Sequence, residues 1–329
     1  MMLEKYCDAA GVSGCEGDIR DIIFKDVESL GETKVDSIGN LIVHKTGKGT
    51  KVMLSSHMDG VGLIVIGIKD DGRIRFAPVG KIDSRILPAK RVVFVKNGLH
   101  GVIGCKPIHL QSEEEYRRSV DVKDMFIDIG PSSKDEVEEH VRVGDYAAFD
   151  SRYVDIGDYI KSPSLDGRAG CAMLTELLSM DFNIDLYGVY TVQHQVGMRG
   201  AAPAAFFVEP EVAIVIDGAD CSDFSDDSAI KLGKGPVISI SDRSFSSDRK
   251  LVNMIIRLAH ERGIPCQIEA AGSGSSDAGV IQRTGSGCET ALISIPVRYA
   301  RGPVTMINKE DYGNTLMLIK SVLTAIERK

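Results

Sequence analysis

Four short segments place imidazole or carboxylate side chains where strands of this chain are predicted to end. They are Ser56-His57-Met58-Asp59, Leu165-Asp166, His194-Gln195 and Ile216-Asp217. Imidazole and carboxylate groups are the usual protein ligands of zinc-class cations, and α/β proteins gather ligands at the carboxyl ends of their strands. Together the segments predict a metal centre at one edge of a sheet.

Each segment alone also has an ordinary structural explanation. A His-x-Asp triplet such as that at 57–59 is more often a surface turn, although an Asp in this position can orient a ligating His. Asp166, at a junction between a loop and a helix, is more often a helix N-cap than a ligand. Asp217 ends a fully apolar strand, where a carboxylate can equally be a cap or turn residue. The metal-site hypothesis therefore depends on the four segments taken together.

The spacing of apolar residues predicts the elements that position these segments. Helices are predicted at two places within 1–32 and over 168–180, 201–208, 247–262 and 308–327, and strands over 40–44, 52–55, 187–192, 212–216 and 291–295. Between about Val61 and Gly144, short apolar runs alternate with turn residues, which is typical of a small β-barrel or sandwich. We therefore expect one α/β domain, residues 1–62 and 160–329, interrupted by an inserted β domain at 63–159.

Composition excludes several classes of partner. The chain has 329 residues and a net charge of −8, which argues against binding to nucleic acid or to an anionic membrane. No apolar run approaches the roughly 18 residues that a membrane span requires. The seven cysteines are scattered without a CxxC pair, which indicates reduced thiols. We expect a cytoplasmic protein that binds neither nucleic acid nor a membrane.

Taken in order, the motifs resemble one family, the tetrahedral (TET) aminopeptidases, also called deblocking or glutamyl aminopeptidases and often misnamed endoglucanases. The matching stretches run from residue 11 to residue 303 and include GVSGCEGDIRDII, SSHMDGVG, LDGRAG, TVQHQVGMRGA, SSDAG and IPVRYARGP. The resemblance implies a zinc-peptidase-like α/β/α sandwich with an inserted PDZ-like β-barrel used for dimerisation. It also implies removal of amino-terminal residues from peptides, and dimers that assemble into a hollow dodecamer.

The resemblance further implies a site for two metal ions, Zn or Co, bridged by one carboxylate. His57 and Asp217 would bind the first ion, Asp166 would bridge both ions, and Asp59 would support His57. All of these residues are present. Asp277, in the loop 272–277, would line the substrate cleft without touching metal. That loop lacks a Walker lysine, so a nucleotide-binding role is not favoured.

The chain departs from the family at the second ion. The resemblance implies a general-base Glu at position 194, a metal-binding Glu at 195 and a metal-binding His at 301, where this chain has His194, Gln195 and Arg301. Gly60 and Gly167 also replace residues that are usually acidic. A neutral amide is a poor zinc ligand, and Arg cannot lose its proton to bind metal. The sequence therefore predicts one divalent metal or none, and no second metal.

Arg301 would also place a fixed positive charge where the second ion would bind, from which it could pair with Asp166 in bidentate form. The formal charges of Asp166, Asp217 and Arg301 add to −1 without metal and +1 with one dication, both acceptable in a partly dry site. Two dications would raise the sum to +3. The charge count therefore agrees with the loss of the second site.

Two hypotheses about function follow. In the first, which we favour, peptidase activity is impaired or absent, and the protein serves as a peptide-binding or assembly subunit, alone or in mixed particles with an active paralogue. In the second, the protein is a one-metal hydrolase in which His57, Asp166 and Asp217 hold the ion. His194 would then act as the general base, because an imidazole accepts protons effectively near neutral pH.

Overall fold

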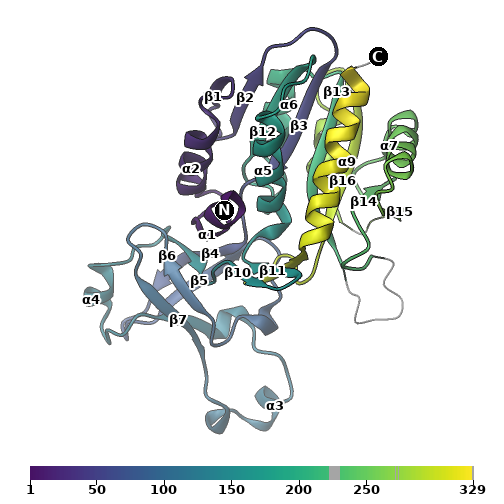
Figure 1. Cartoon of the computed structure of the whole chain (residues 1–329). Coiled ribbons are helices and arrows are strands. Elements are labelled where there is room, and N and C mark those ends of the chain that lie inside the picture. The colour runs from purple at the N-terminus through teal and green to yellow at the C-terminus, as the bar shows by residue number, and fades with distance from the viewer. Residues whose placement is uncertain (222–229, 271, 273, 328–329) are drawn as a thin grey trace.

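The computed structural model describes residues 1–221, 230–270, 272 and 274–327. In this part of the chain an eight-stranded mixed sheet lies between two layers of helices (Figure 1). In spatial order its strands are β1 (Glu32–Val35), β2 (Leu41–Lys45), β12 (Asp185–Thr191), β3 (Lys51–His57), β13 (Val212–Asp220), β16 (Glu289–Val297), β14 (Val237–Ser239) and β15 (Gln267–Glu269). The predicted α/β/α arrangement is confirmed.

The four central strands, β12, β3, β13 and β16, are parallel. Their registers place Thr191 beside His57 and Asp217 beside Ser294. Both faces of these strands are buried, which explains why their sequences read as nearly continuous apolar runs. The shared direction brings their carboxyl ends to one edge of the sheet.

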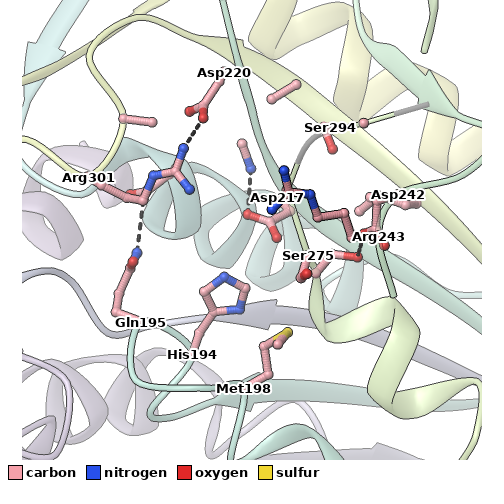
Figure 2. Close-up of a pocket in the computed structure, with 18 of the residues that line it drawn as sticks. His194, Gln195, Met198, Asp217, Asp220, Asp242, Arg243, Ser275, Ser294 and Arg301 are labelled. Carbon is pink, nitrogen blue, oxygen red and sulfur yellow. Dashed lines mark hydrogen bonds and ion pairs between the residues drawn. The ribbon is translucent and has the colours of Figure 1, made fainter. Parts of the chain in front are cut away.

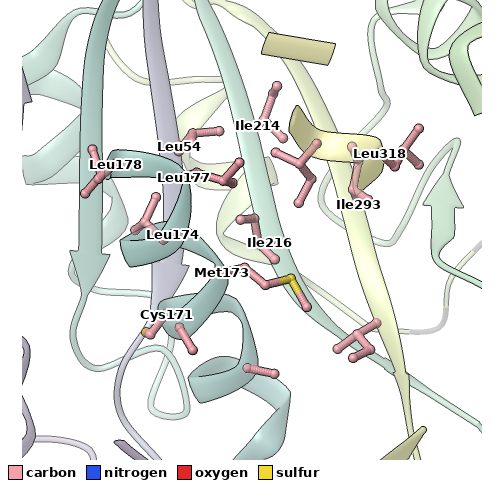
Figure 3. Close-up of a cluster of buried hydrophobic side chains, with 14 of the residues drawn as sticks. Leu54, Cys171, Met173, Leu174, Leu177, Leu178, Ile214, Ile216, Ile293 and Leu318 are labelled. Atoms are coloured by element: carbon pink, nitrogen blue, oxygen red, sulfur yellow. The ribbon is translucent and has the colours of Figure 1, made fainter. Parts of the chain in front are cut away.

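The two faces of the sheet bury different helices. Alternate residues of β3 point to opposite sides, so Val52 and Leu54 belong to one core and Met53 to the other. The first core also contains residues of α1 (Met2–Asp8), α2 (Gly17–Val27), α5 (Leu165–Leu178), α7 (Arg249–Glu261) and α9 (Lys309–Glu327) (Figure 3). The second core contains residues of α6 (Ala201–Val208) and α8 (Asp277–Ile281).

The inserted region forms a closed antiparallel barrel of six strands with its own apolar core. The barrel lies beyond one end of the large sheet (Figure 1). Its strands in barrel order are β4 (Gly62–Ile68), β5 (Ile74–Val79), β8 (Met125–Asp128), β7 (His100–Cys105), β6 (Arg91–Phe94) and β9 (Tyr146–Phe149), and its short helices are α3 (Glu113–Tyr116) and α4 (Lys134–Glu138). Of the two predicted forms, barrel and sandwich, the barrel is present.

A small three-stranded sheet follows the barrel, made of β10 (Val154–Ile156), β11 (Tyr159–Ser162) and β17 (Thr305–Asn308). β11, where the chain leaves the barrel, pairs with β17, which directly precedes α9. Asn308 caps α9 as predicted, because its Oδ1 accepts from the amides of Glu310 at 2.8 Å and Asp311 at 3.1 Å. No helix within the described residues is both long and apolar enough to span a membrane.

Candidate active site

The carboxyl edge of the parallel strands brings the predicted ligands together. His57 ends β3 and Asp217 lies near the end of β13, while His194 and Gln195 follow β12 after a short turn. Asp166 enters from the first turn of α5, whose N-cap is Ser164. Asp166 is therefore not the N-cap, and its carboxylate is available to the site.

His57 is buried between two carboxylates. Its Nδ1 lies 3.0 Å from the backbone oxygen and 3.4 Å from Oδ1 of Asp59, and its Nε2 lies 3.5 Å from Oδ1 of Asp217. Burial disfavours the charged ring, but the two carboxylates outweigh it and raise the pKa of His57 well above its usual value. Burial likewise opposes ionisation of Asp59, yet contact with His57 lowers its pKa to about 2. The cluster therefore attracts positive charge strongly.

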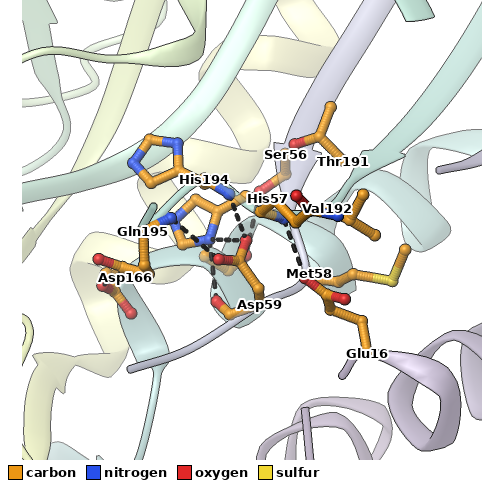
Figure 4. A network of polar contacts seen from close by, with 12 residues as sticks. Glu16, Ser56, His57, Met58, Asp59, Asp166, Thr191, Val192, His194 and Gln195 are labelled. Carbon is orange, nitrogen blue, oxygen red and sulfur yellow. Dashed lines mark hydrogen bonds and ion pairs between the residues drawn. The ribbon is translucent and has the colours of Figure 1, made fainter. Parts of the chain in front are cut away.

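Asp59 also holds the turn that carries His194. Its two carboxylate oxygens accept from the backbone amides of His194 at 3.0 Å and Gln195 at 2.9 Å (Figure 4). One buried carboxylate thus supports the ring of His57 and fixes the backbone of the next two site residues. Asp59 thus lies beside His57, where the resemblance implies a supporting residue, and it also accepts from the two backbone amides of the following turn.

His194 stacks on His57 and is oriented by Asp277. The ring centroids of the two histidines are 4.1 Å apart and their planes differ by 11°. The Nδ1 atom of His194 lies 2.8 Å from Oδ1 of Asp277, whose Oδ2 accepts from the hydroxyl of Thr191 at 2.6 Å. Asp277 begins α8 and is buried. It therefore contacts His194 from the side away from the cavity and is not one of the residues that line the cavity.

Among the described residues, one group of potential metal ligands has ligand atoms that all lie within 4.8 Å of one another. It consists of His57, His194 and Asp217. The Nε2 atom of His57 is buried and has no hydrogen-bond partner in the described part of the chain. A buried ring nitrogen without a hydrogen-bond partner, beside a second imidazole and a carboxylate, fits a divalent cation of the zinc class.

The second-metal positions hold groups with other partners. The Gln195 amide donates from Nε2 to Oδ2 of Asp166 at 3.1 Å. Arg301 pairs with Asp220, so the expected bidentate pair between Arg301 and Asp166 is wrong (Figure 2). Asp220 ends β13, three residues beyond Asp217, and from there it reaches the loop that follows β16. The parallel register of β13 and β16 pairs Asp220 with Val297, so Asp220 lies at the start of the loop that carries Arg301.

Gly167 is required by the position of His57. A Cβ added to Gly167 would overlap both the backbone oxygen and the imidazole ring of His57. A Cβ on Gly60 would likewise overlap the hydroxyl of Ser164. The absence of a side chain at these two positions thus lets β3 and the start of α5 approach each other closely.

The site opens into a cavity of about 340 Å³. Its wall includes Asp166, His194, Gln195 and Asp217, together with charged side chains of both signs from neighbouring loops, which are Lys81, Asp220, Asp242, Arg243, Glu269 and Arg301 (Figure 2). Gly272, Gly274, Ser275 and Ser276 also line the cavity, and Ser273 lies outside the described residues. A cavity with both charges suits a ligand that carries an ammonium group and a polar backbone.

Sequence reasoning missed two other residues that build the site. Asp220 gave a signal only in its spacing from Asp217 in the DGAD stretch. Arg168 is buried and donates to the backbone oxygens of Met58 at 3.1 Å and Ala9 at 2.5 Å, among others. It thereby fixes the N-terminal segment against the loop that carries His57 and Asp59. Nothing in its sequence context distinguishes it from a surface arginine.

Comparison with known proteins agrees with this architecture. The model of the M42 glutamyl aminopeptidase family matches residues 39–318. A putative aminopeptidase of Acetivibrio thermocellus is 37% identical over 97% of this chain and 96% of its own length. The TET aminopeptidase from the archaeon Thaumarchaeota SCGC AB-539-E09 superposes with a TM-score of 0.94 at 30% identity, covering 98% of this chain and 96% of that one. The Pyrococcus horikoshii TET1 peptidase, which can assemble into a tetrahedron or a large octahedral shell, gives 0.88 at 35% identity, with 97% of each chain covered. The chain therefore belongs to the M42 glutamyl aminopeptidase family.

Proposed function

We propose that this protein binds one divalent cation and the amino-terminal end of a peptide in the cavity, and that its aminopeptidase activity is strongly impaired. One observation carries the proposal. The groups at both second-metal positions are turned to other partners, since the Gln195 amide binds Asp166 and Arg301 pairs with Asp220. The carboxylate that would bridge two ions is thus already bonded to a neutral donor.

The charges of the cavity support the proposal of peptide binding. Carboxylates such as Asp166 and Asp220 offer partners for a peptide ammonium group, while Lys81 and Arg243 supply donors for carbonyl oxygens. A divalent ion held in the cluster would supply Lewis-acid chemistry by polarising a carbonyl group. The general base is the missing component, because no carboxylate follows Val192-Gln193 at position 194. Loss of a positioned base alone typically costs about 10²–10⁴-fold in rate.

A second candidate function, a one-metal aminopeptidase in which His194 accepts the proton, is favoured by one specific contact. Asp277 lies 2.8 Å from Nδ1 of His194 and fixes the ring so that Nε2 is the free nitrogen. A carboxylate placed behind an imidazole in this way orients it and stabilises its charged form. Under this alternative, a Zn-loaded or Co-loaded protein would hydrolyse peptides with a rate that depends on both residues.

We also propose an assembly role. Residues 1–62 and 160–329 would form the peptidase-like domain, and residues 63–159 a barrel that pairs two chains. The dodecamer of PhTET1-12s, 34% identical to this chain, and the tetrahedral assembly of the Pyrococcus horikoshii TET1 peptidase support a dodecamer of such dimers. The particle would form from this chain alone or together with an active paralogue. Light scattering of the purified protein tests the first form, and co-purification with the paralogue tests the second.

The test of the main proposal is restoration of the implied two-metal site. The triple variant His194→Glu, Gln195→Glu, Arg301→His should bind two zinc ions and hydrolyse aminoacyl p-nitroanilides at least about 100-fold faster than the wild type. His260→Gln, which changes an exposed histidine of α7, serves as the control for handling and folding. A wild-type protein that already hydrolyses these substrates as fast as the triple variant, with both fully folded, would contradict the proposal.

A further inference from the structure

We propose that His194, and not Asp166, is the third protein ligand of the single cation, which gives a centre of two histidines and one carboxylate formed by His57, His194 and Asp217. This inference rests on the proposed function, because it assumes one cation in this cavity. It alters the ligand set that the family resemblance implies. It also gives His194 a role other than that of general base.

Both imidazoles have an oxygen partner at Nδ1, which leaves Nε2 as the nitrogen that can bind a metal. The Nδ1 atom of His57 lies 3.0 Å from the backbone oxygen of Asp59, and the Nδ1 atom of His194 lies 2.8 Å from the carboxylate of Asp277. An imidazole that donates from Nδ1 presents the lone pair of Nε2, and such contacts accompany nearly all metal-binding histidines. Two rings with the same arrangement, both placed beside Asp217, form a prepared pair.

The distances agree with one shared ion. Ligand atoms about 2.05 Å from a tetrahedral zinc ion lie about 3.3 Å from each other. The Nε2 atom of His57 is already 3.5 Å from Oδ1 of Asp217. All three ligand atoms of the group lie within 4.8 Å of one another, so shifts of up to about 1.5 Å bring them to ligand separation. Because the two rings are stacked with their planes 11° apart, one ring also tilts so that both Nε2 lone pairs point at the ion. The unpartnered Nε2 of His57 gains a partner in the process.

Gln195 engages one of the two carboxylate oxygens of Asp166. The amide of Gln195 donates to Oδ2 of Asp166, and the backbone of Gln195 is itself fixed by Asp59 at 2.9 Å. Within the described residues, Asp166 is not a member of the group of close ligand atoms. It remains beside the cation as a negative charge facing the cavity, where it can receive a substrate ammonium group.

The resulting donor set has the composition of a catalytic zinc site. Two ring nitrogens and one carboxylate leave an open position, which is the usual arrangement where zinc acts on a substrate. One dication with the carboxylates of Asp217 and Asp166 gives a formally neutral cluster, and the Arg301–Asp220 pair adds no net charge. A second dication would leave the cluster strongly positive, so the same residues that build this centre exclude another ion.

X-ray absorption at the zinc edge, together with zinc affinity from chelator competition, tests the ligand set without relying on activity. The wild type should bind one zinc with two imidazole ligands, whereas the set His57, Asp166 and Asp217 would give one. His194→Gln should remove one imidazole from the spectrum and weaken zinc binding more than about 100-fold, since losing a ligand exceeds the loss of its support. Asp277→Asn should weaken binding roughly 10–100-fold and leave both imidazoles in place.

Two further variants test whether Asp166 binds the ion and whether a substitution outside the cavity changes zinc binding. Asp166→Asn should keep two imidazoles and bind zinc within about tenfold of the wild type, because it removes only a nearby charge. His260→Gln, far from the cavity, should match the wild type in both measurements. Circular dichroism of each variant confirms that it is folded before zinc is added.

The outcomes separate this inference from the proposed function. One bound zinc with a single imidazole, unchanged in His194→Gln and lost in Asp166→Asn, overturns the inference and leaves the one-cation proposal standing. No zinc binding by the folded wild type overturns both. One bound zinc with two imidazoles, one of which disappears in His194→Gln, supports both.

Discussion

Gln195→Glu tests how the bridging carboxylate is held. The Nε2 atom of Gln195 lies 3.1 Å from Oδ2 of Asp166, so the substitution places two carboxylate oxygens at that separation. At an effective dielectric constant near 20, two unit charges at this distance repel each other by about 5 kcal/mol. Taking up a proton at pH 7.5, against an ordinary Glu pKa near 4.3, costs about 4 kcal/mol. Protonation is thus the cheaper outcome and sets the loss of stability.

The sign of the pH dependence follows from that argument. A carboxyl group whose pKa is raised on folding destabilises the protein increasingly as pH rises above its unfolded pKa. The variant should therefore unfold close to the wild-type temperature at pH 5 and roughly 10 °C below it at pH 7.5, since 1 kcal/mol corresponds to about 2–4 °C in a large domain. Zinc should recover part of the difference, because a cation between the two carboxylates removes their repulsion.

Differential scanning calorimetry at the two pH values measures this effect. Gln111→Glu is the matched control, because it adds the same charge in the barrel, where the native side chain donates to the backbone oxygen of Lys106. If Gln195→Glu unfolds at the same temperature as Gln111→Glu at both pH values, the contact between Gln195 and Asp166 is absent in solution. The account of the blocked bridging carboxylate would then be wrong.

Three other predictions follow from buried contacts in and around the site. Gly167→Ala should lower the free energy of unfolding by about 1–3 kcal/mol and weaken zinc binding, because its Cβ overlaps His57. Gly313→Ala, at a helical position with open space, is the control and should leave zinc binding unchanged and stabilise α9 slightly. Chemical denaturation and zinc titration compare the two variants, and equal behaviour would contradict the overlap at Gly167. Burial raises the pKa of the Cys7 and Cys171 thiols to about 12. Maleimide at pH 7.5 or pH 9 should therefore leave both thiols of the native protein unlabelled. Detection of either labelled thiol by mass spectrometry before unfolding would contradict their burial. Arg168→Met should lower the free energy of unfolding by about 3 kcal/mol or more, because several buried carbonyl oxygens lose their donor. The N-terminal segment should also become accessible to limited proteolysis. An unaltered cleavage pattern would contradict the role given to this side chain.

The elements of the fold could be predicted because their signals are local. Periodic apolar residues mark α7 and α9, and continuous apolar runs mark β13 and β16. The α5 helix starts three residues earlier than expected, because the backbone oxygen of Ser164 already accepts a helical hydrogen bond from the amide of Arg168 at 3.0 Å. Strands such as β10, β14 and β15 have three residues each and leave too short a pattern to recognise.

The partners within the site could be predicted only in part. Asp59 lies two residues from His57, so their contact follows from local spacing. Asp277 and His194 are 83 residues apart in the sequence, and their contact depends on the packing of α8 against α6, β13 and β16. The resemblance places Arg301 where a second ion would bind, which suggests a pair with Asp166, but the loop after β16 brings Arg301 to Asp220 instead. Short motifs thus identified the residues, and three-dimensional packing decided their partners.

The central claim is that this site holds one cation, where the family resemblance implies two. Anomalous diffraction at the zinc absorption edge, from crystals of the wild-type protein soaked in zinc, tests it most directly. We expect a single strong peak per chain, within ligand distance of His57, His194 and Asp217, and no peak between Gln195 and Arg301. Two peaks separated by about 3.5–4 Å and bridged by Asp166 would contradict the account.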